Sequence, residues 1–285
     1  MERRIAVIGG DLRQVYLAQM LLDEGLDVVT WGLEKGGGPQ PVPLHMALEA
    51  EVLVLPLPVC RGGGLNLPLT DTALDPEQLW PRLRYDQLVL GGMTGELTPR
   101  LMADFGLTVI DYYAREELQV ANAVPTAEGA IQRAMEATDG TLHGSRCLVL
   151  GFGRVGKLLA HRLRAMGAQV TAAARKYRDL AWIEALDFES LPMGRLSERL
   201  GTFDLIFNTV PSLLLDASRL AETKESCLLM ELASAPGGID PGAAERLGRR
   251  LIQALGLPGV TAPRAAAGAI RESIRHILEE RGEPL

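Results

Sequence analysis

The sequence has 285 residues, 47% of them hydrophobic and 23% charged, a balance typical of globular proteins and long enough for two domains. This composition excludes a disordered chain, and an aromatic content of only 5% argues against a stacking surface for single-stranded nucleic acid. The formal net charge of −7 provides no general attraction to nucleic acid or to an anionic membrane. Any anionic ligand is therefore expected to bind at a local group of donors.

Three widely spaced cysteines, Cys60, Cys147 and Cys227, lie in or beside apolar stretches and form no CxxC pair. They are expected to be reduced, buried thiols of a protein in a reducing compartment. The N-terminus has no apolar signal-peptide core, and the longest apolar runs are too short to span a membrane. The four histidines show no metal-binding spacing. We therefore expect a cytoplasmic protein with no metal site and no interaction with membranes or nucleic acid.

Short aliphatic runs alternate with helical patterns along most of the chain, which is typical of parallel α/β sheets. The expected strands of the first half cover 5–8, 27–31, 52–57, 87–90 and 108–110, with a helix at 13–24. Those of the second half cover 146–150, 169–174, 205–209, 228–231 and 250–253, with a helix at 155–166. The fold class is therefore predicted to be α/β, with two doubly wound, Rossmann-like domains and a cleft between them.

Two further helices are expected to connect the halves. One begins at Pro125, with Thr126 as its N-cap and Glu128 in its first turn, and runs to about Thr138. The other covers about 265–280 and crosses back onto the first domain. The sequence thus predicts a substrate domain of residues 1–120 plus about 265–285 and a cofactor domain of residues 121–264. Loops of both domains are expected to meet in the cleft.

A glycine loop follows the first strand of the second half. Gly151, Phe152, Gly153, Arg154, Val155 and Gly156 form a GxGxxG motif between that strand and a helix. The first glycine permits the tight turn, the second lets the backbone approach a pyrophosphate, and the third allows close packing of helix on strand. The helix N-terminus then offers its amide groups to phosphates. These six residues are predicted to bind a dinucleotide; the alternative is a purely structural glycine turn.

The end of the next strand distinguishes between cofactors. NAD sites usually have an acidic residue there, about 20 residues after the loop, to hold the ribose 2′-hydroxyl. This chain has Arg175 and Lys176 instead. Basic residues favour the 2′-phosphate of NADP, so the sequence predicts NADP rather than NAD. The alternative is that both are solvated loop charges.

Two further strand ends carry candidate contacts to the nicotinamide end of the cofactor. Asn208, Thr209, Val210 and Pro211 end the third strand of the second half, and Ala233 follows the fourth. Small polar residues before a proline at such a position commonly line the nicotinamide and its ribose. The alternative is a strand stop set by Pro211.

The first half opens with a different loop. Asp11 stands where a dinucleotide loop has its second glycine, and Gln14 replaces the third. A carboxylate there would repel a pyrophosphate, so this loop is expected to bind a small substrate whose anionic group pairs with Arg13. The competing interpretation is that Asp11 serves only as a helix N-cap.

Together these motifs resemble the family of dipicolinate synthase A subunits over nearly the whole chain. The similarity is carried by Gly9-Gly10-Asp11-Leu12-Arg13, by 122–131 (NAVPTAEGAI), by the loop 151–156, by 208–211, by 235–238 and by Leu257-Pro258-Gly259. The segment PTAEGAI and the GGD–R opening are the specific parts, because the glycine loop is shared with many dehydrogenases. More broadly, the chain resembles the two-domain fold of D-2-hydroxyacid and alanine dehydrogenases.

The resemblance implies NADP-dependent oxidation of the dihydrodipicolinate synthase product to dipicolinate (pyridine-2,6-dicarboxylate), in the mother cell of a spore-forming bacterium. It also implies a flavoprotein-like partner, the dipicolinate synthase B subunit, and a homo-oligomer is expected. On this hypothesis Arg13 pairs with a carboxylate of the small dicarboxylate substrate, and Asn122 and Thr126 donate hydrogen bonds to it. Asp11 or Glu128 accepts the proton, although Glu128 could instead serve only the helix dipole.

Two other functions remain open from the sequence. One is a 2-hydroxyacid or amino-acid dehydrogenase of another substrate, which would need a His or Lys base that is not recognisable in the cleft loops. The other is a nucleotide-binding regulatory subunit whose partner carries the chemistry.

Overall fold

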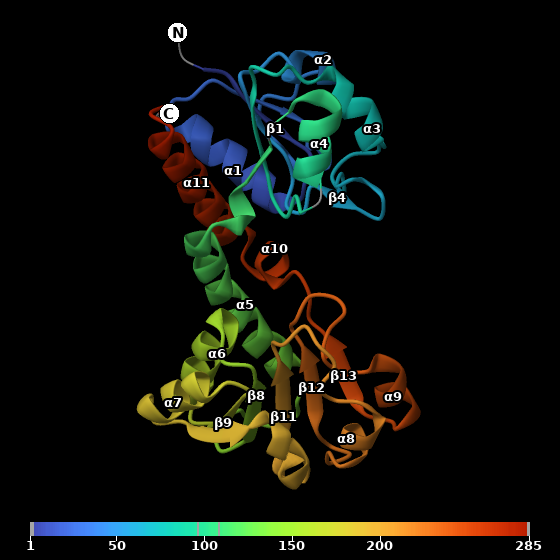
Figure 1. Cartoon of the computed structure of the whole chain (residues 1–285), viewed down its shortest axis with the longest axis vertical. Helices are drawn as coiled ribbons and strands as arrows, with labels where there is room; N and C mark the ends of the chain where they lie inside the picture. Colours follow the sequence, from blue (N-terminus) through green and yellow to red (C-terminus); the bar gives the residue numbers. More distant parts are fainter. Residues whose placement is uncertain (1–2, 96, 108, 284–285) are drawn as a thin grey trace. The chain divides into compact units, whose positions relative to one another are not determined.

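The computed structural model describes residues 3–95, 97–107 and 109–283. The chain forms two compact units: unit 1 comprises Met1–Asn122 with Ala262–Leu285, and unit 2 comprises Ala123–Thr261. Each unit has its own parallel sheet flanked by helices (Figure 1). Hydrophobic cores lie on both faces of each sheet. The prediction of two parallel-sheet α/β domains is confirmed.

Five parallel strands form the sheet of unit 1, in the order β2-β1-β3-β6-β7. They are β1 (Ile5–Ile8), β2 (Val28–Trp31), β3 (Val52–Val54), β6 (Leu88–Gly91) and β7 (Val109–Asp111); a hairpin of β4 (Cys60–Arg61) and β5 (Gly64–Leu65) lies outside the sheet. Most residues of the five sheet strands are buried, as expected for a sheet covered on both faces. Strand β7 overlaps the predicted strand 108–110, of which Thr108 lies outside the described residues.

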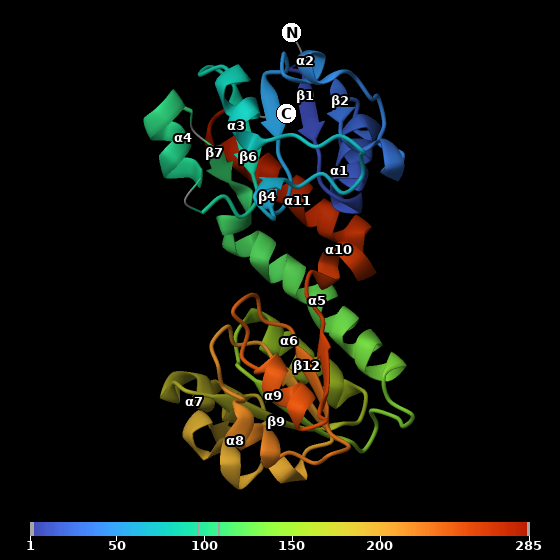
Figure 2. The same cartoon turned by 90° about the vertical axis from the view of Figure 1, so that its right-hand side faces the viewer.

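Helices cover both faces of this sheet. One face packs against α1 (Leu12–Asp23) and α11 (Pro263–Glu280), and the other against α2 (Leu44–Ala47), α3 (Pro76–Leu79) and α4 (Leu97–Phe105). Figure 2 shows α3 and α4 in front of the sheet and α11 behind it. Short 3₁₀ turns are η1 (Glu34–Gly36), η2 (Trp80–Arg82) and η3 (Tyr112–Ala114). The last helix therefore packs on the first half of the chain, as the sequence predicts.

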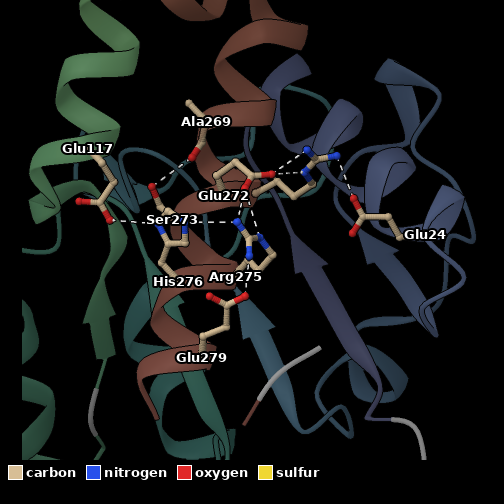
Figure 3. A network of polar contacts seen from close by, with 9 residues as sticks. Glu24, Glu117, Ala269, Glu272, Ser273, Arg275, His276 and Glu279 are labelled. Atoms are coloured by element: carbon tan, nitrogen blue, oxygen red, sulfur yellow. Dashed lines mark hydrogen bonds and ion pairs between the residues drawn. The ribbon is translucent and has the colours of Figure 1, made fainter. Parts of the chain in front are cut away.

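The polar face of α11 carries a network of charged side chains (Figure 3). Arg271 bridges Glu24, beyond the end of α1, at 2.8 Å and Glu272 at 2.7 Å. Glu272 also pairs with Arg275 at 2.8 Å. The Arg271–Glu24 pair therefore links α11 to the end of α1 beside their apolar contact, and the other two pairs lie within α11.

Six parallel strands form the sheet of unit 2, in the order β10-β9-β8-β11-β12-β13. They are β8 (Arg146–Leu150), β9 (Gln169–Ala174), β10 (Glu189–Pro192), β11 (Leu205–Asn208), β12 (Leu228–Glu231) and β13 (Arg250–Gln253). All but β10 match predicted strands to within one residue. Strand β10 was not predicted because it is a short edge strand of mixed polarity that ends in proline.

Unit 2 also has helices on both faces of its sheet. The C-terminal part of α5 (Glu116–Glu136), α6 (Arg154–Ala165) and α7 (Tyr177–Ala185) cover one face. The other packs against α8 (Ala217–Ala221), α9 (Pro241–Arg246), η4 (Met193–Glu198) and η5 (Leu200–Thr202), and α10 (Leu257–Thr261) ends the unit. In Figure 2, α9 lies in front of β12 and α6 behind it.

The predicted start of the connecting helix is wrong. Helix α5 begins at Glu116, so Pro125 lies inside it and Thr126 is not its N-cap. The nine residues before Pro125 include good helix formers, and Glu116 and Glu117 in the first turn complement the helix dipole. These contributions, with tertiary packing, outweigh the backbone hydrogen bond that an internal proline removes. Glu128 consequently lies in mid-helix, and the alternative role in dipole pairing is wrong as well.

Candidate functional site

The glycine loop between β8 and α6 has the geometry of a phosphate-binding turn. Gly151 has a φ of +95°, and a Cβ there would lie 2.5 Å from Thr209 Oγ1. A Cβ on Gly156 would lie 2.1 Å from the Gly151 carbonyl oxygen, so only glycine permits this helix–strand contact. No described atom lies within 4 Å of a Cβ on Gly153, which leaves its backbone open to a ligand. The turn and the close packing thus fit the steric roles expected of Gly151 and Gly156, and pyrophosphate binding at Gly153 stays a prediction.

The N-terminus of α6 is open to an anion, in contrast to that of α1. Gly153 is the N-cap of α6 and supplies no side-chain hydrogen bond to the first turn. At α1 the N-cap Asp11 accepts from the Arg13 backbone N–H at 3.0 Å, and Gln14 Oε1 accepts from the Asp11 N–H at 3.1 Å. Because this capping box already supplies a carboxylate, α1 is unsuited to phosphate whereas α6 is suited to it.

The remaining residues of the glycine loop divide between core and surface. The Phe152 ring is buried and lies edge-on to Phe188, with ring centroids 6.1 Å apart. Arg154 is exposed, and Val155 is half-buried in the first turn of α6. Phe152 therefore fixes the loop to the core through its side chain, and its backbone remains part of the turn.

Arg175 and Lys176 follow β9 and are both exposed. Within the described ranges neither forms an ion pair or a side-chain hydrogen bond, whereas the neighbouring Arg178 contacts Asp179 at 3.4 Å. Two unengaged cations at this strand end, together with the open turn and helix N-terminus of α6, fit a dinucleotide with an additional phosphate on its ribose.

The ends of β11 and β12 are joined by a buried polar contact that the sequence did not reveal. Asn208 is fully buried and donates from Nδ2 to Glu231 Oε1 at 2.7 Å. The same carboxylate oxygen accepts from the Ala233 N–H at 3.0 Å. Thr209 donates from its hydroxyl to the Leu150 carbonyl at 2.8 Å. Glu231 could have been noticed as an acidic residue closing an otherwise apolar strand.

Val210 and Pro211 follow Asn208 and Thr209 in the chain, and Val210 is held by the Asn208 side chain. The Val210 N–H donates to Asn208 Oδ1 at 3.2 Å, and its carbonyl accepts from Asn208 Nδ2 at 2.9 Å. Val210 is half-buried and Pro211 is exposed. The segment 209–211 therefore lies at the carboxyl edge of the sheet, next to the glycine loop.

In unit 1 the structure brings Asp11 and Arg13 together. Arg13 donates from Nε to Asp11 Oδ1 at 2.9 Å and from Nη2 to Asp11 Oδ2 at 2.8 Å, and Nη2 also contacts the Leu57 carbonyl. The Arg13 side chain is only 13% exposed. In the described part of the chain no acceptor contacts Nη1, so the guanidinium retains donor capacity for an anion.

The three candidates on α5 fall into two sets. Asn122 and Thr126 are four residues apart and so share one face of the helix. Glu128 is exposed and its Oε1 accepts from Arg162 Nη2 of α6 at 3.2 Å. Glu128 is thus engaged in an ion pair within unit 2.

A cavity of about 470 Å³ in unit 2 lies elsewhere, between α5 and the edge strand β13. Its lining includes Arg133, Glu136, Arg250, Leu255 and Val260, none of them a predicted site residue. Among the described residues, no three His, Cys, Asp or Glu side chains are grouped to hold a metal ion. No helix in the described ranges is long and apolar enough to cross a membrane.

Known proteins resemble the chain in both halves. Residues 4–113 match the N-terminal domain of the dipicolinate synthase A subunit, and residues 107–237 match the NAD binding domain of D-isomer specific 2-hydroxyacid dehydrogenases. The dipicolinate synthase A subunit of Bacillus subtilis (strain 168) is 29% identical over 97% of this chain and 96% of its own length.

Comparison with solved structures points to the same relatives as comparison of the sequences. The dipicolinate synthase A subunit of Bacillus halodurans superposes with a TM-score of 0.89 at 27% identity, covering 97% of each chain. An L-alanine dehydrogenase shares the fold alone, with a TM-score of 0.66 at 18% identity over 98% of this chain and 90% of its own. The sequence resemblance is thereby confirmed: the chain is an NAD(P)-dependent oxidoreductase with a Rossmann-type nucleotide-binding domain and a homologue of the dipicolinate synthase A subunit.

Proposed function

We propose that this chain oxidises the product of dihydrodipicolinate synthase to dipicolinate, with NADP as the acceptor. The observation that carries the proposal is the contrast between the two strand–turn–helix openings. The turn before α6 has no side-chain cap, because its N-cap is Gly153, whereas Asp11 and Arg13 close the turn before α1. Unit 2 is thus suited to a dinucleotide and unit 1 to a small anionic substrate, in keeping with the name of the relatives.

NADP is proposed because of the charges after β9. Arg175 and Lys176 are exposed cations where an NAD site usually has an acidic residue. Gly151, Gly153 and Gly156 would hold the pyrophosphate at the N-terminus of α6. When bound, the nicotinamide ring supplies the hydride acceptor.

The chain's own residues must hold a dicarboxylate and receive a proton. We assign substrate binding to Arg13, whose Nη1 is not engaged in the described part of the chain, with Asn122 and Thr126 as further contacts. We assign the proton acceptor to Asp11 or Glu128; each is already paired with an arginine, Asp11 with Arg13 and Glu128 with Arg162. Loss of a hydride to the nicotinamide and of a proton to this acceptor would turn a dihydropyridine ring into an aromatic pyridine, so positioning can supply much of the rate.

The proposal includes a partner and a setting. The name of the relatives describes one subunit of a synthase, so we propose a complex with the flavoprotein-like B subunit, together with a homo-oligomer of this chain. The setting would be the cytoplasm of the mother cell in a spore-forming bacterium.

Turnover by the purified chain tests the proposal. A dihydrodipicolinate synthase reaction supplies the substrate, and NADP reduction is followed together with the ultraviolet absorbance of the pyridine product, with and without the flavoprotein-like partner. Matching NADP reduction and pyridine formation by the chain alone would support catalysis by its own residues. Turnover only with the partner, despite NADP binding by this chain, would favour the regulatory alternative. No turnover under either condition would contradict the assignment and favour a dehydrogenase of another substrate.

A further inference from the structure

Glu231 is a buried carboxylate in an otherwise apolar strand. It ends β12 after Leu228-Leu229-Met230 and is only 5% exposed. Burial of an ionised carboxylate is costly unless the group is paired or hydrogen-bonded. No lysine, arginine or histidine of the described residues forms an ion pair with it, so its buried oxygens depend on hydrogen-bond donors.

Four donors surround this carboxylate. Oε1 accepts from Asn208 Nδ2 at 2.7 Å and from the Ala233 N–H at 3.0 Å. Oε2 accepts from the Gly238 N–H at 2.7 Å and the Ile239 N–H at 2.9 Å. Both oxygens thus accept two hydrogen bonds, which tie this one side chain to three backbone N–H groups and to the Asn208 amide.

The loop after β12 is folded closely around these contacts. Gly237 has a φ of +81° and lies beside the Glu231 carboxylate. A Cβ on Gly238 would lie 2.5 Å from Asn208 Nδ2 and 2.7 Å from the Val210 carbonyl. The loop therefore has no room for a side chain at Gly238.

Hydrogen bonds of Asn208 and its neighbour Thr209 connect the Glu231 carboxylate to the glycine loop. Asn208 holds Val210 through both ends of its amide, and Thr209 donates to the Leu150 carbonyl, directly before Gly151. Ligands of open α/β sheets bind at this carboxyl edge. A change at Glu231 would therefore be transmitted to the loops that line the proposed cofactor site.

We propose that Glu231 is a positioning residue for dinucleotide binding: its carboxylate joins the loops after β11 and β12 and fixes residues 208–211 and 233 before the ligand arrives. This inference rests on the proposed cofactor site. A glutamine at 231 offers one acceptor oxygen and one NH2 group, so two of the four donors would face another donor. The loops would then sample other arrangements, and binding would have to restore the productive one.

Binding measurements on the full chain test the inference. In Glu231→Gln, the dissociation constant for NADP, measured by titration calorimetry, is expected to rise at least tenfold. Amide hydrogen exchange at Ala233, Gly238 and Ile239 should accelerate. The matched control is Asp204→Asn, because Asp204 also binds a backbone N–H, that of Arg146 at 2.8 Å, but precedes β11 at the opposite edge of the sheet. This control should lower the thermal midpoint while leaving the NADP dissociation constant unchanged.

The outcomes separate the inference from the proposed function. If the wild-type chain binds neither NADP nor NAD, the proposed cofactor site is overturned, and the inference with it. If it binds NAD alone, only the choice of NADP is overturned, and the variants are compared with NAD. If the wild type binds and Glu231→Gln binds equally well, the positioning role alone is overturned. An equal loss of affinity in Glu231→Gln and Asp204→Asn would reduce Glu231 to general stability and also overturn the role. Should Glu231→Gln not fold, Asn208→Ser, which removes one of the four donors, must raise the dissociation constant for the inference to stand.

Discussion

At the scale of single residues, glycines and charges determine what each loop can accept. Gly156 approaches the Gly151 carbonyl so closely that any side chain would collide with it, whereas Gly153 faces open space. Asp11, at the corresponding position in unit 1, caps its helix and pairs with Arg13. Glycine at this position, as at Gly153, thus leaves the turn open to a phosphate, whereas aspartate, as at Asp11, closes it.

Replacing Gly156 by alanine should disrupt dinucleotide binding. The new Cβ would lie 2.1 Å from the Gly151 carbonyl oxygen, a backbone atom that cannot move without displacing the turn. Overpacking of this kind costs about 1–3 kcal/mol, so NADP affinity should fall about tenfold or more in a fluorescence titration. Gly194→Ala is the control, because no described atom lies within 4 Å of a Cβ there. Equal affinities of the two variants would contradict the proposed turn.

Replacing Arg175 by serine should weaken NADP binding and leave NAD binding nearly unchanged. A charge-assisted hydrogen bond contributes about 1.5–3 kcal/mol, which corresponds to a loss of about tenfold to a hundredfold in affinity. Parallel titrations with NADP and NAD measure the ratio of the two dissociation constants. Arg195→Ser serves as the control, since Arg195 is another exposed arginine of unit 2 and already pairs with Glu198 at 2.6 Å. An unchanged NADP-to-NAD ratio in Arg175→Ser would favour NAD as the cofactor.

At the scale of elements, helices α5 and α11 are determined by their contacts more than by local signals. Helix α5 runs through Pro125, and its C-terminal part packs on the sheet of unit 2. Helix α11 buries Ile270, Ile274 and Ile277 in the core that it shares with α1. Most of the stability of such helices comes from tertiary packing of an apolar face.

The charged face of α11 should make stability depend on pH. Hydrogen bonds from Arg275 and then Arg271 lower the pKa of Glu272. Because the folded-state pKa lies below the unfolded one, the contribution is full above the ordinary glutamate pKa of about 4.3 and is lost as pH falls below it. Glu272→Gln should lower stability by at most about 1 kcal/mol at pH 7, as for other exposed pairs.

Urea denaturation at pH 7 and pH 3 measures this dependence. The difference between wild type and Glu272→Gln should be present at pH 7 and should shrink at pH 3. Glu225→Gln is a suitable control, because Glu225 has no ion pair among the described residues. A difference that stays constant with pH would contradict an electrostatic origin.

At the scale of the whole molecule, the two units have separate cores and differ in which parts of the chain form them. Unit 2 is one continuous segment, 123–261, whereas unit 1 is assembled from both ends of the chain. Its core contains buried residues of α1 and of α11, which are far apart in sequence. Unit 1 is thus complete only when the last helix is in place.

Truncation of Ile274 to alanine should therefore destabilise unit 1 selectively. Ile274 is 1% exposed, and such a truncation typically costs 2–5 kcal/mol, roughly the range seen in other cores. Differential scanning calorimetry should show a lower thermal midpoint for one transition while NADP still binds. Ile183→Ala, which removes a fully buried isoleucine of unit 2, should shift the other transition and weaken NADP binding. If both variants shifted the same single transition, the two units would unfold together.

The sequence by itself determined the parallel α/β class, most of the strands and the glycine loop, because these depend on local periodicity and on glycines whose steric role is local. It also indicated the resemblance to dipicolinate synthase A subunits, which the comparisons support. Only the tertiary structure decided that α5 continues through Pro125, that Glu128 pairs with Arg162, and that Glu231 joins two loops. Each of these depends on partners distant in sequence, and the energy of such contacts has no signature in local composition.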